Sequence, residues 1–190
     1  MKKLISLLLA LVMVFAFAGC NNDTDTTTEP QVQLPASALE ILTTVWNAYG
    51  ENDKFFAIGG SFDAPVDNAP GAYNLEDEGL MYSLLVSQDK VASVTEAASL
   101  MHAMNANTFT GAAYALAEGT DIAAFAESMK QNIQGNQWMC GFPEKLLIVT
   151  LGEKYVVVAF GHGDAMTPFQ TNLTTAYPDA KIVYDEAVMG

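Results

Sequence analysis

The hydrophobic and polar positions in the second half of the chain follow two different periods. Segments rich in apolar, β-branched and aromatic residues predict strands at 108–117, 145–151 and 154–160. Between the first and second of these strands, apolar residues recur every three to four positions, which predicts a helix over 121–134. Thr120 is expected to cap this helix and Gly135 to end it.

The remaining pattern predicts a hairpin turn, a second helix and a last strand. Gly152-Glu153 has glycine first, as a two-residue type II′ turn requires, and is expected to join the second and third strands. Thr167-Pro168 predicts the start of a helix that Pro178 ends. The last strand is expected at 180–184.

The elements expected between residues 108 and 185 follow the order β-α-β-β-α-β. This is the ferredoxin-like order, so the expected fold class is α+β with a four-stranded antiparallel sheet. Both helices of the motif are then expected on one face of the sheet. Additional N-terminal helices are expected on the other face or at an edge.

Two such N-terminal helices are predicted. Ser37 and Glu40 form a capping box at the start of a helix over 37–49. Apolar residues at helical spacing predict the other helix over 91–104. A short strand is expected at 54–58, whereas the apolar run 80–86 is ambiguous between strand and helix.

The first twenty residues have the pattern of an export signal. Lys2-Lys3 precedes an apolar run over 4–18, and small residues follow, as in a secretory signal peptide. The run is shorter than the roughly 20 apolar residues that a membrane-spanning helix needs. The pattern therefore predicts an exported protein.

Cys20 directly follows Ala18-Gly19, and this junction resembles the lipobox of bacterial lipoproteins. The resemblance implies that 1–19 is a lipoprotein signal peptide and that Cys20 carries a diacylglycerol thioether. Phe17 stands where the lipobox usually has leucine. Since 16–18 also fits the pattern for ordinary signal peptidase, the alternative is a free secreted protein that starts at Gly19.

The segment 20–35 is polar, rich in threonine and without a burial pattern. Such a composition predicts a flexible tether between the membrane and the folded part of the chain. A single α+β domain is expected over 36–190, a length that suits one domain.

The chain is strongly acidic, with a formal net charge of −14 from 22 acidic residues and eight lysines, and it contains no arginine. This balance excludes a nucleic-acid-binding protein, which needs a basic surface. Without arginine there is no bidentate clamp for phosphate, and no phosphate-binding glycine motif is present, so phosphoryl transfer is not expected. Anionic lipid headgroups are expected to repel the domain, so only an acyl anchor would hold it at a membrane.

The densest unusual segment is 136–144, which joins a predicted helix to a predicted strand. Its aromatic and sulfur-containing side chains are candidates for binding an apolar ligand or partner: Trp138, Met139, Cys140 and Phe142. The chain has two cysteines, and lipidation of Cys20 leaves Cys140 without an intramolecular disulfide partner. The alternative is that these rings plug the open end of the sheet and that Cys140 is a small buried hydrophobic residue.

The turn 161–164 supplies two more candidate binding residues, His162 and Asp164, which suit acid–base or metal chemistry. The alternative is an ordinary glycine-containing turn between a strand and a helix. The chain has only one other histidine, so a histidine-based metal site needs both to converge. The following residues could in principle form a soft Cu(I)-type site: Met101, His102, Met104, Met139, Cys140, His162 and Met166.

An acidic cluster is a candidate Ca²⁺ site, although it lacks the spacing of an EF-hand loop. Its oxygen-bearing residues are Asp63, Asp67, Asn68, Glu76, Asp77 and Glu78. The alternative for the segment 74–78 is a capped helix start enriched in acidic residues. No motif of a hydrolase or a redox enzyme stands out, and no carboxylate pair is singled out, so the sequence selects no enzymatic activity.

The runs 104–110 and 138–146, together with 155–157 and 176–178, resemble uncharacterised lipoproteins of Gram-positive gut anaerobes, which carry a domain of unknown function. The resemblance implies a lipoprotein anchored to the outer face of the cell membrane. It implies no activity and no site residue.

The expected function is that of a membrane-tethered, non-enzymatic binding module of the cell envelope. Its expected surface combines the 138–143 loop with the 161–164 turn, because both lie at the end of the hairpin opposite Gly152-Glu153. The expected partners are the membrane, through the lipid anchor, and an unknown small molecule or envelope protein. The alternative is a soft-metal or redox-linked extracytoplasmic protein that uses Cys140 and the histidines, and a hydrolase of envelope polymers has the least support.

Overall fold

The computed structural model describes residues 34–188. The predicted signal peptide, Cys20 and nearly all of the predicted tether lie outside these residues. Within them the fold is α+β, with an antiparallel sheet of eight strands and five α-helices. None of the helices in this part of the chain is long and apolar enough to cross a membrane.

The strands form one sheet in the order β2-β1-β4-β5-β7-β6-β8, and β3 also pairs with β4. All pairs are antiparallel. The strands are β1 (Ala57–Gly59), β2 (Val66–Asp67), β3 (Gly71–Tyr73), β4 (Val94–His102), β5 (Phe109–Leu116), β6 (Lys145–Leu151), β7 (Tyr155–Gly161) and β8 (Lys181–Ala187).

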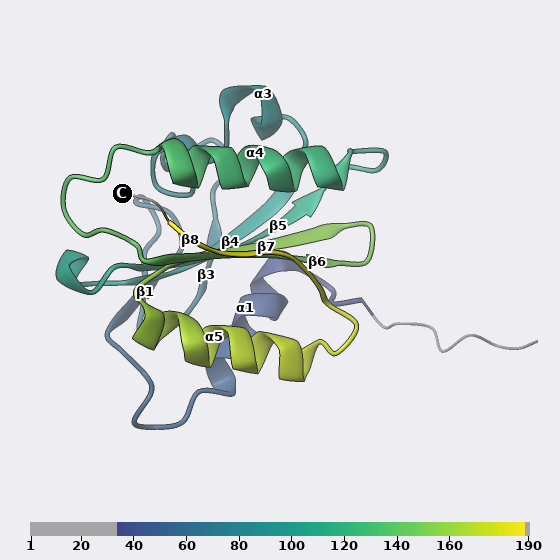
Figure 1. The fold of residues 1–190 in the computed structure, drawn as a ribbon. Helices are drawn as coiled ribbons and strands as arrows, with labels where there is room; N and C mark the ends of the chain where they lie inside the picture. Colours follow the sequence, from purple (N-terminus) through teal and green to yellow (C-terminus); the bar gives the residue numbers. More distant parts are fainter. Residues whose placement is uncertain (1–33, 189–190) are drawn as a thin grey trace, which may run out of the picture. The chain divides into compact units, whose positions relative to one another are not determined.

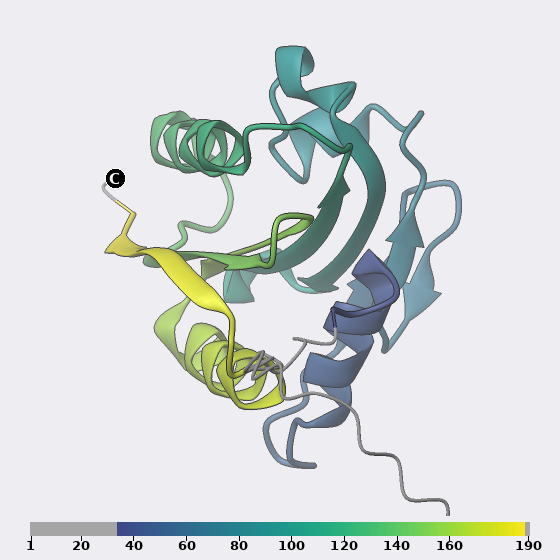
Figure 2. The ribbon, with the colours of Figure 1, turned by 90° about the vertical axis from the view of Figure 1, so that its right-hand side faces the viewer.

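Helices cover both faces of this sheet, as Figure 1 shows. One face is covered by α4 (Ile122–Gly135), with the short helices α2 (Gly79–Tyr82) and α3 (Gln88–Val91) on the same side. The other face is covered by α1 (Ala38–Asn47) and α5 (Gly163–Ala176), which lie side by side beneath the sheet in Figure 2.

The central strands are buried on both faces, which explains why they are continuously apolar in the sequence. Along β7, Val157 and Ala159 belong to the core between the sheet and helices α1 and α5. Val156 and Val158 belong to the core between the sheet and α4. Every residue of β7 is buried. An alternating pattern of apolar and polar residues would have left one of these faces polar.

The ferredoxin-like arrangement is not confirmed. In that arrangement the last strand lies beside the first strand of the motif, but here β8 pairs with β6 at the other end of the sheet. The edge of β5 that the last strand would need is occupied by β4, which pairs with β5 over nearly its whole length.

The expectation that both helices lie on one face is wrong, because α4 and α5 lie on opposite faces. The position of β8, beside β6 and not beside β5, explains this difference. The connections β5-α4-β6 and β7-α5-β8 cross the sheet in the same direction but begin on antiparallel strands. Right-handed crossovers of that kind place their helices on opposite faces.

The predicted helix over 91–104 is also wrong, because most of this segment is strand β4. Its apolar residues recur at helical spacing, but in the strand Ala97 and Ala98 point to opposite faces of the sheet and both are buried. Strand β4 pairs with β5 on one side and with β1 and β3 on the other. These hydrogen bonds, together with burial on both faces, override the local helix propensity.

Several predicted boundaries shift by a few residues. Asp121, not Thr120, caps α4 by accepting a hydrogen bond from the backbone N–H of Ala124 at 2.9 Å. Helix α5 begins at Gly163, about one turn before Pro168. The β6–β7 connection has three residues instead of two, because Leu151 pairs with Tyr155, and Gly152 adopts a φ of +58° within it.

Ser37 caps the first helix as predicted, whereas the reciprocal hydrogen bond of Glu40 goes to the residue before the cap. The Ser37 hydroxyl oxygen accepts a hydrogen bond from the backbone N–H of Glu40 at 3.0 Å, and the Glu40 carboxylate accepts one from the N–H of Ala36 at 2.7 Å. The residues of α1 that face the sheet, among them Ile41 and Leu42, are fully buried.

We expect Tyr114→Phe to destabilise the protein by about 1–2 kcal/mol, because it leaves a buried carbonyl without its donor. The Tyr114 hydroxyl is fully buried in β5 and donates to the carbonyl of Leu84 at 2.9 Å. Urea unfolding followed by tryptophan fluorescence measures the change. Tyr82→Phe is the matched control, since Tyr82 is 74% exposed. Equal stability of the two variants would contradict the prediction.

Candidate functional site

The two segments that the sequence singles out lie at the same end of the sheet, opposite the β6–β7 turn (Figure 1). Glu144 joins them in two ways. Its backbone N–H donates to the carbonyl of Gly161 at 3.0 Å, and its carboxylate accepts from the N–H of Gly163 at 2.9 Å. The base of the loop 136–144 is therefore bonded to the first turn of α5.

The loop 136–144 is attached to the core on one side and exposed on the other. The Trp138 ring packs on Phe160 at a centroid distance of 5.3 Å and is partly buried, and Pro143 is buried. Met139 is 87% exposed and Phe142 is 60% exposed. The loop thus presents two large apolar side chains to solvent from a fixed base.

Cys140 lies between these two residues in the sequence and is exposed. The alternative in which Cys140 is a small buried residue is therefore wrong. Trp138, in contrast, matches the alternative reading of a plug, and its buried indole N–H has no hydrogen-bond partner among residues 34–188.

The turn after β7 places His162 and Asp164 at the start of α5. His162 is the N-cap residue, and its backbone N–H donates to the carbonyl of Thr108 at 2.8 Å, but its side chain makes no capping hydrogen bond. The Asp164 carboxylate is exposed and accepts from the N–H of Ala165 at 2.8 Å.

Strand register brings the second histidine to the same place. Met101 of β4 lies opposite Thr110 of β5, which in turn lies opposite Phe160 of β7. His102, the last residue of β4, therefore lies at the same end of the sheet as His162, which directly follows β7. The charges of Asp164 and His162 both act on the pKa of His102.

The environment of His102 disfavours protonation of its ring. Its Nδ1 accepts a hydrogen bond from the backbone N–H of Met104 at 3.0 Å, and its ring stacks on Phe55 at a centroid distance of 4.9 Å and an interplanar angle of 10°. Burial lowers the pKa of His102, an effect that nearby Asp164 opposes and His162 reinforces.

The described part of the chain holds no metal site made of histidine, cysteine or carboxylate ligands, and the methionine part of the Cu(I) hypothesis stays a prediction. Between residues 34 and 188, no three histidine, cysteine, aspartate or glutamate side chains are placed to hold a metal ion. This finding covers the set of Cys140 with the two histidines as well as the acidic cluster proposed for Ca²⁺.

Two carboxylates of the acidic cluster instead organise the loop around them. Asp63 accepts from the Ser61 hydroxyl and the Asn74 amide, and these hydrogen bonds lower its pKa. Asp77 accepts from the backbone N–H groups of Phe62 and Gly79. Carboxylates that accept hydrogen bonds from their own loop have a structural role, because they hold the loop in its conformation.

Sequence analysis missed Glu144 and Phe55, which position the site. Glu144 directly precedes a predicted strand, and only the fold reveals that it reaches the start of α5. Phe55 is distant in sequence from His102, and no spacing signal links the two.

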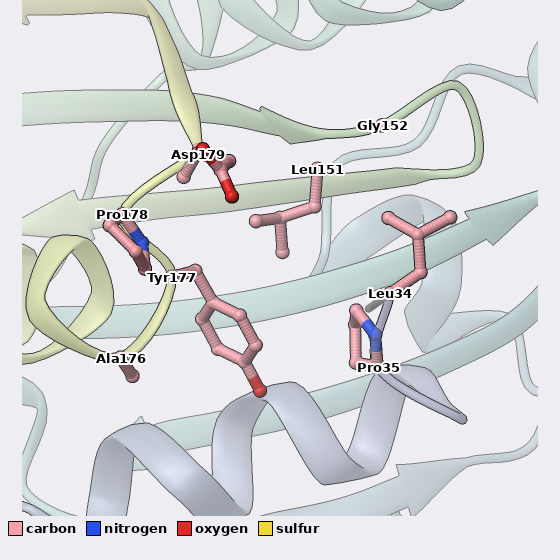
Figure 3. Close-up of a pocket in the computed structure, with 9 residues that line it drawn as sticks. Leu34, Pro35, Leu151, Gly152, Ala176, Tyr177, Pro178 and Asp179 are labelled. Atoms are coloured by element: carbon pink, nitrogen blue, oxygen red, sulfur yellow. The ribbon is translucent and has the colours of Figure 1, made fainter. Parts of the chain in front are cut away.

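A hollow at the opposite end of the sheet is too small to be a ligand site. Figure 3 shows Leu34 and Pro35 on one side of it and Tyr177 and Pro178 on the other. Its volume is about 90 Å³. Sites for small molecules usually measure about 300 to 1,000 Å³.

We expect the stability of the protein to fall as the pH drops below 6.5, the ordinary pKa of histidine, in part because of His102. The unfolded chain binds this proton more tightly than the folded protein, so protonation favours unfolding in this window. The stability advantage of the wild type over His102→Gln should shrink from pH 7.5 to 5 in urea titrations. An NMR titration of His102 with a midpoint at or above 6.5 would contradict the prediction.

No family model, curated protein or solved structure matches this chain. The resemblance to Gram-positive lipoproteins therefore stays a prediction from the sequence.

Proposed function

We propose that this protein is a lipid-anchored binding module of the cell envelope that recognises an envelope protein through the loop 136–144. The residues that make the contact are Met139, Cys140 and Phe142, which we call the loop surface. The proposal is of a non-enzymatic protein, attached through Cys20 to the outer face of the cell membrane.

The exposure of Met139 and Phe142 is the observation that carries this proposal. Exposed apolar side chains that stand close together on a surface commonly mark interaction sites. Aromatic residues are frequent anchors of interfaces, and methionine adapts to irregular apolar surfaces.

The fixed base of the loop adds to this support. Trp138 on Phe160 and the Glu144–Gly163 hydrogen bond hold both ends of the exposed segment in place. A preformed loop loses little conformational entropy when it binds, so more of the contact energy is available for affinity.

The lipid anchor is supported by the sequence alone. The apolar run 4–18 and the Ala18-Gly19-Cys20 junction resemble a lipoprotein signal, and the segment after Cys20 is polar. With a net charge of −14, the chain as a whole has no electrostatic attraction to anionic lipids. The acyl chains would therefore supply the membrane affinity, and two or more chains are needed for stable attachment.

We expect Cys20→Ser to move the protein from the membrane fraction to the soluble fraction of cells that express it. Metabolic labelling with an alkyne fatty acid, followed by mass spectrometry of the N-terminal peptide, measures the acylation directly. Cys140→Ser is the matched control and should stay labelled and membrane-bound. Unchanged labelling of Cys20→Ser would rule out the anchor.

The loop surface can be tested through its own thiol, because Cys140 is exposed and Cys20 is blocked if it is acylated. We expect a benzophenone maleimide attached to Cys140 on intact cells to crosslink the protein to a defined envelope partner after irradiation. The double variant Met139→Ser with Phe142→Ser should lose the adduct, because it removes the apolar contact.

The control for this experiment is Phe62→Ser with Tyr82→Ser, which removes two side chains of similar exposure, 72% and 74%, outside the loop. This variant should keep the adduct. Absence of any discrete adduct, or an adduct that persists in the loop variant, would overturn the proposed surface.

A further inference from the structure

We propose that a hollow beside the first turn of α5 binds a free amino acid by its ammonium and carboxylate groups. The hollow has a volume of about 330 Å³. Its walls come from the loop 52–55, from His102 at the end of β4, from Asn107 in the 3₁₀ helix (Asn105–Asn107) and from the start of α5. We call it the α5 hollow.

The α5 hollow contains charges of both signs. Its charged lining residues are Asp53 and Asp164, which carry carboxylates, and Lys54, which carries an ammonium group at the end of a flexible side chain. Among the ion pairs of residues 34–188, none involves these three side chains. The Lys54 ammonium lies over the Trp46 ring instead, 5.6 Å from its centroid.

Opposite charges that share a hollow without pairing are available to a ligand that carries both charges. The carboxylates would accept hydrogen bonds from an ammonium group, and Lys54 would neutralise a carboxylate. Asn52 and Asn107 line the same hollow and add neutral donors and acceptors. An amino acid is the smallest common compound that satisfies both charges at once.

The rest of the lining suits the uncharged part of such a ligand. Phe55 stacks on His102, and Pro168 contributes another apolar wall. His102 adds no positive charge in its neutral form, in which Nδ1 accepts the Met104 N–H. The volume lies at the lower end of the range of about 300 to 1,000 Å³ for small-molecule sites, which favours a free amino acid over a longer peptide.

This inference goes beyond the proposed loop surface and does not depend on it. Met139 and Phe142 do not line the α5 hollow. Failure to bind amino acids would therefore leave the loop surface unaffected, and loss of the loop contact would leave the α5 hollow intact.

Isothermal titration calorimetry of the purified full-length protein against the standard amino acids, up to about 10 mM, is the direct test. We expect at least one amino acid to bind. Its N-acetyl derivative, which lacks the ammonium charge, and its amide, which lacks the carboxylate, should each bind at least about ten-fold more weakly, because each loses one charge-assisted contact. These comparisons use wild-type protein and so do not depend on the folding of a variant.

Two variants then assign the charges. Lys54→Met should bind the amino acid about ten-fold more weakly and no longer distinguish it from its amide, whereas Asp164→Asn should no longer distinguish it from its N-acetyl derivative. Lys181→Met and Asp179→Asn, exposed residues outside the α5 hollow, are the matched controls and should bind like wild type.

Three results would overturn the inference. The first is the absence of binding by every amino acid. The second is equal binding of the amino acid and its amide, which would indicate a site for amines only. The third is wild-type affinity in both Lys54→Met and Asp164→Asn.

Discussion

The pairing of β4 with β5 is the interaction on which the rest of this structure depends. These strands pair from Val94–Leu116 to Met101–Thr110, with one irregularity between Val94 and Glu96. With β7 on its other side, β5 has no free edge for the end of the chain. The last strand therefore joins the sheet at β6, and right-handed crossovers then send α5 to the face opposite α4.

This division of the helices decides what each face can bury. The face without α4 accommodates both α1 and α5, so its core combines side chains from three regions of the chain that are distant in sequence. The α4 face is completed by the segment around α2, in which Leu80 and Leu84 are fully buried. Strands between two such layers must be apolar on both sides, as β6 and β7 are.

The same register creates the candidate site. Because β4, β5 and β7 are aligned, His102 ends near the point at which β7 leads into His162 and α5. The loop 136–144 reaches this end of the sheet because it leads into β6, whose first residues pair with the last residues of β7. An apolar loop surface and a hollow with mixed charges thus lie at the end of the sheet away from the β6–β7 turn.

Local signals in the sequence determined the class of fold and several of its elements. The Ser37–Glu40 cap, the apolar runs of β6 and β7 and the helical spacing in α4 each act over a few residues, so they can be recognised without the fold. The candidate residues Met139 and Phe142 were also visible as an unusual apolar loop. Only tertiary structure decided that β4 is a strand, that β8 lies beside β6, and that Phe55, His102 and Asp164 meet. These outcomes depend on hydrogen bonds and packing contacts between residues far apart in the chain. The spacing of residues within a short segment does not indicate such contacts.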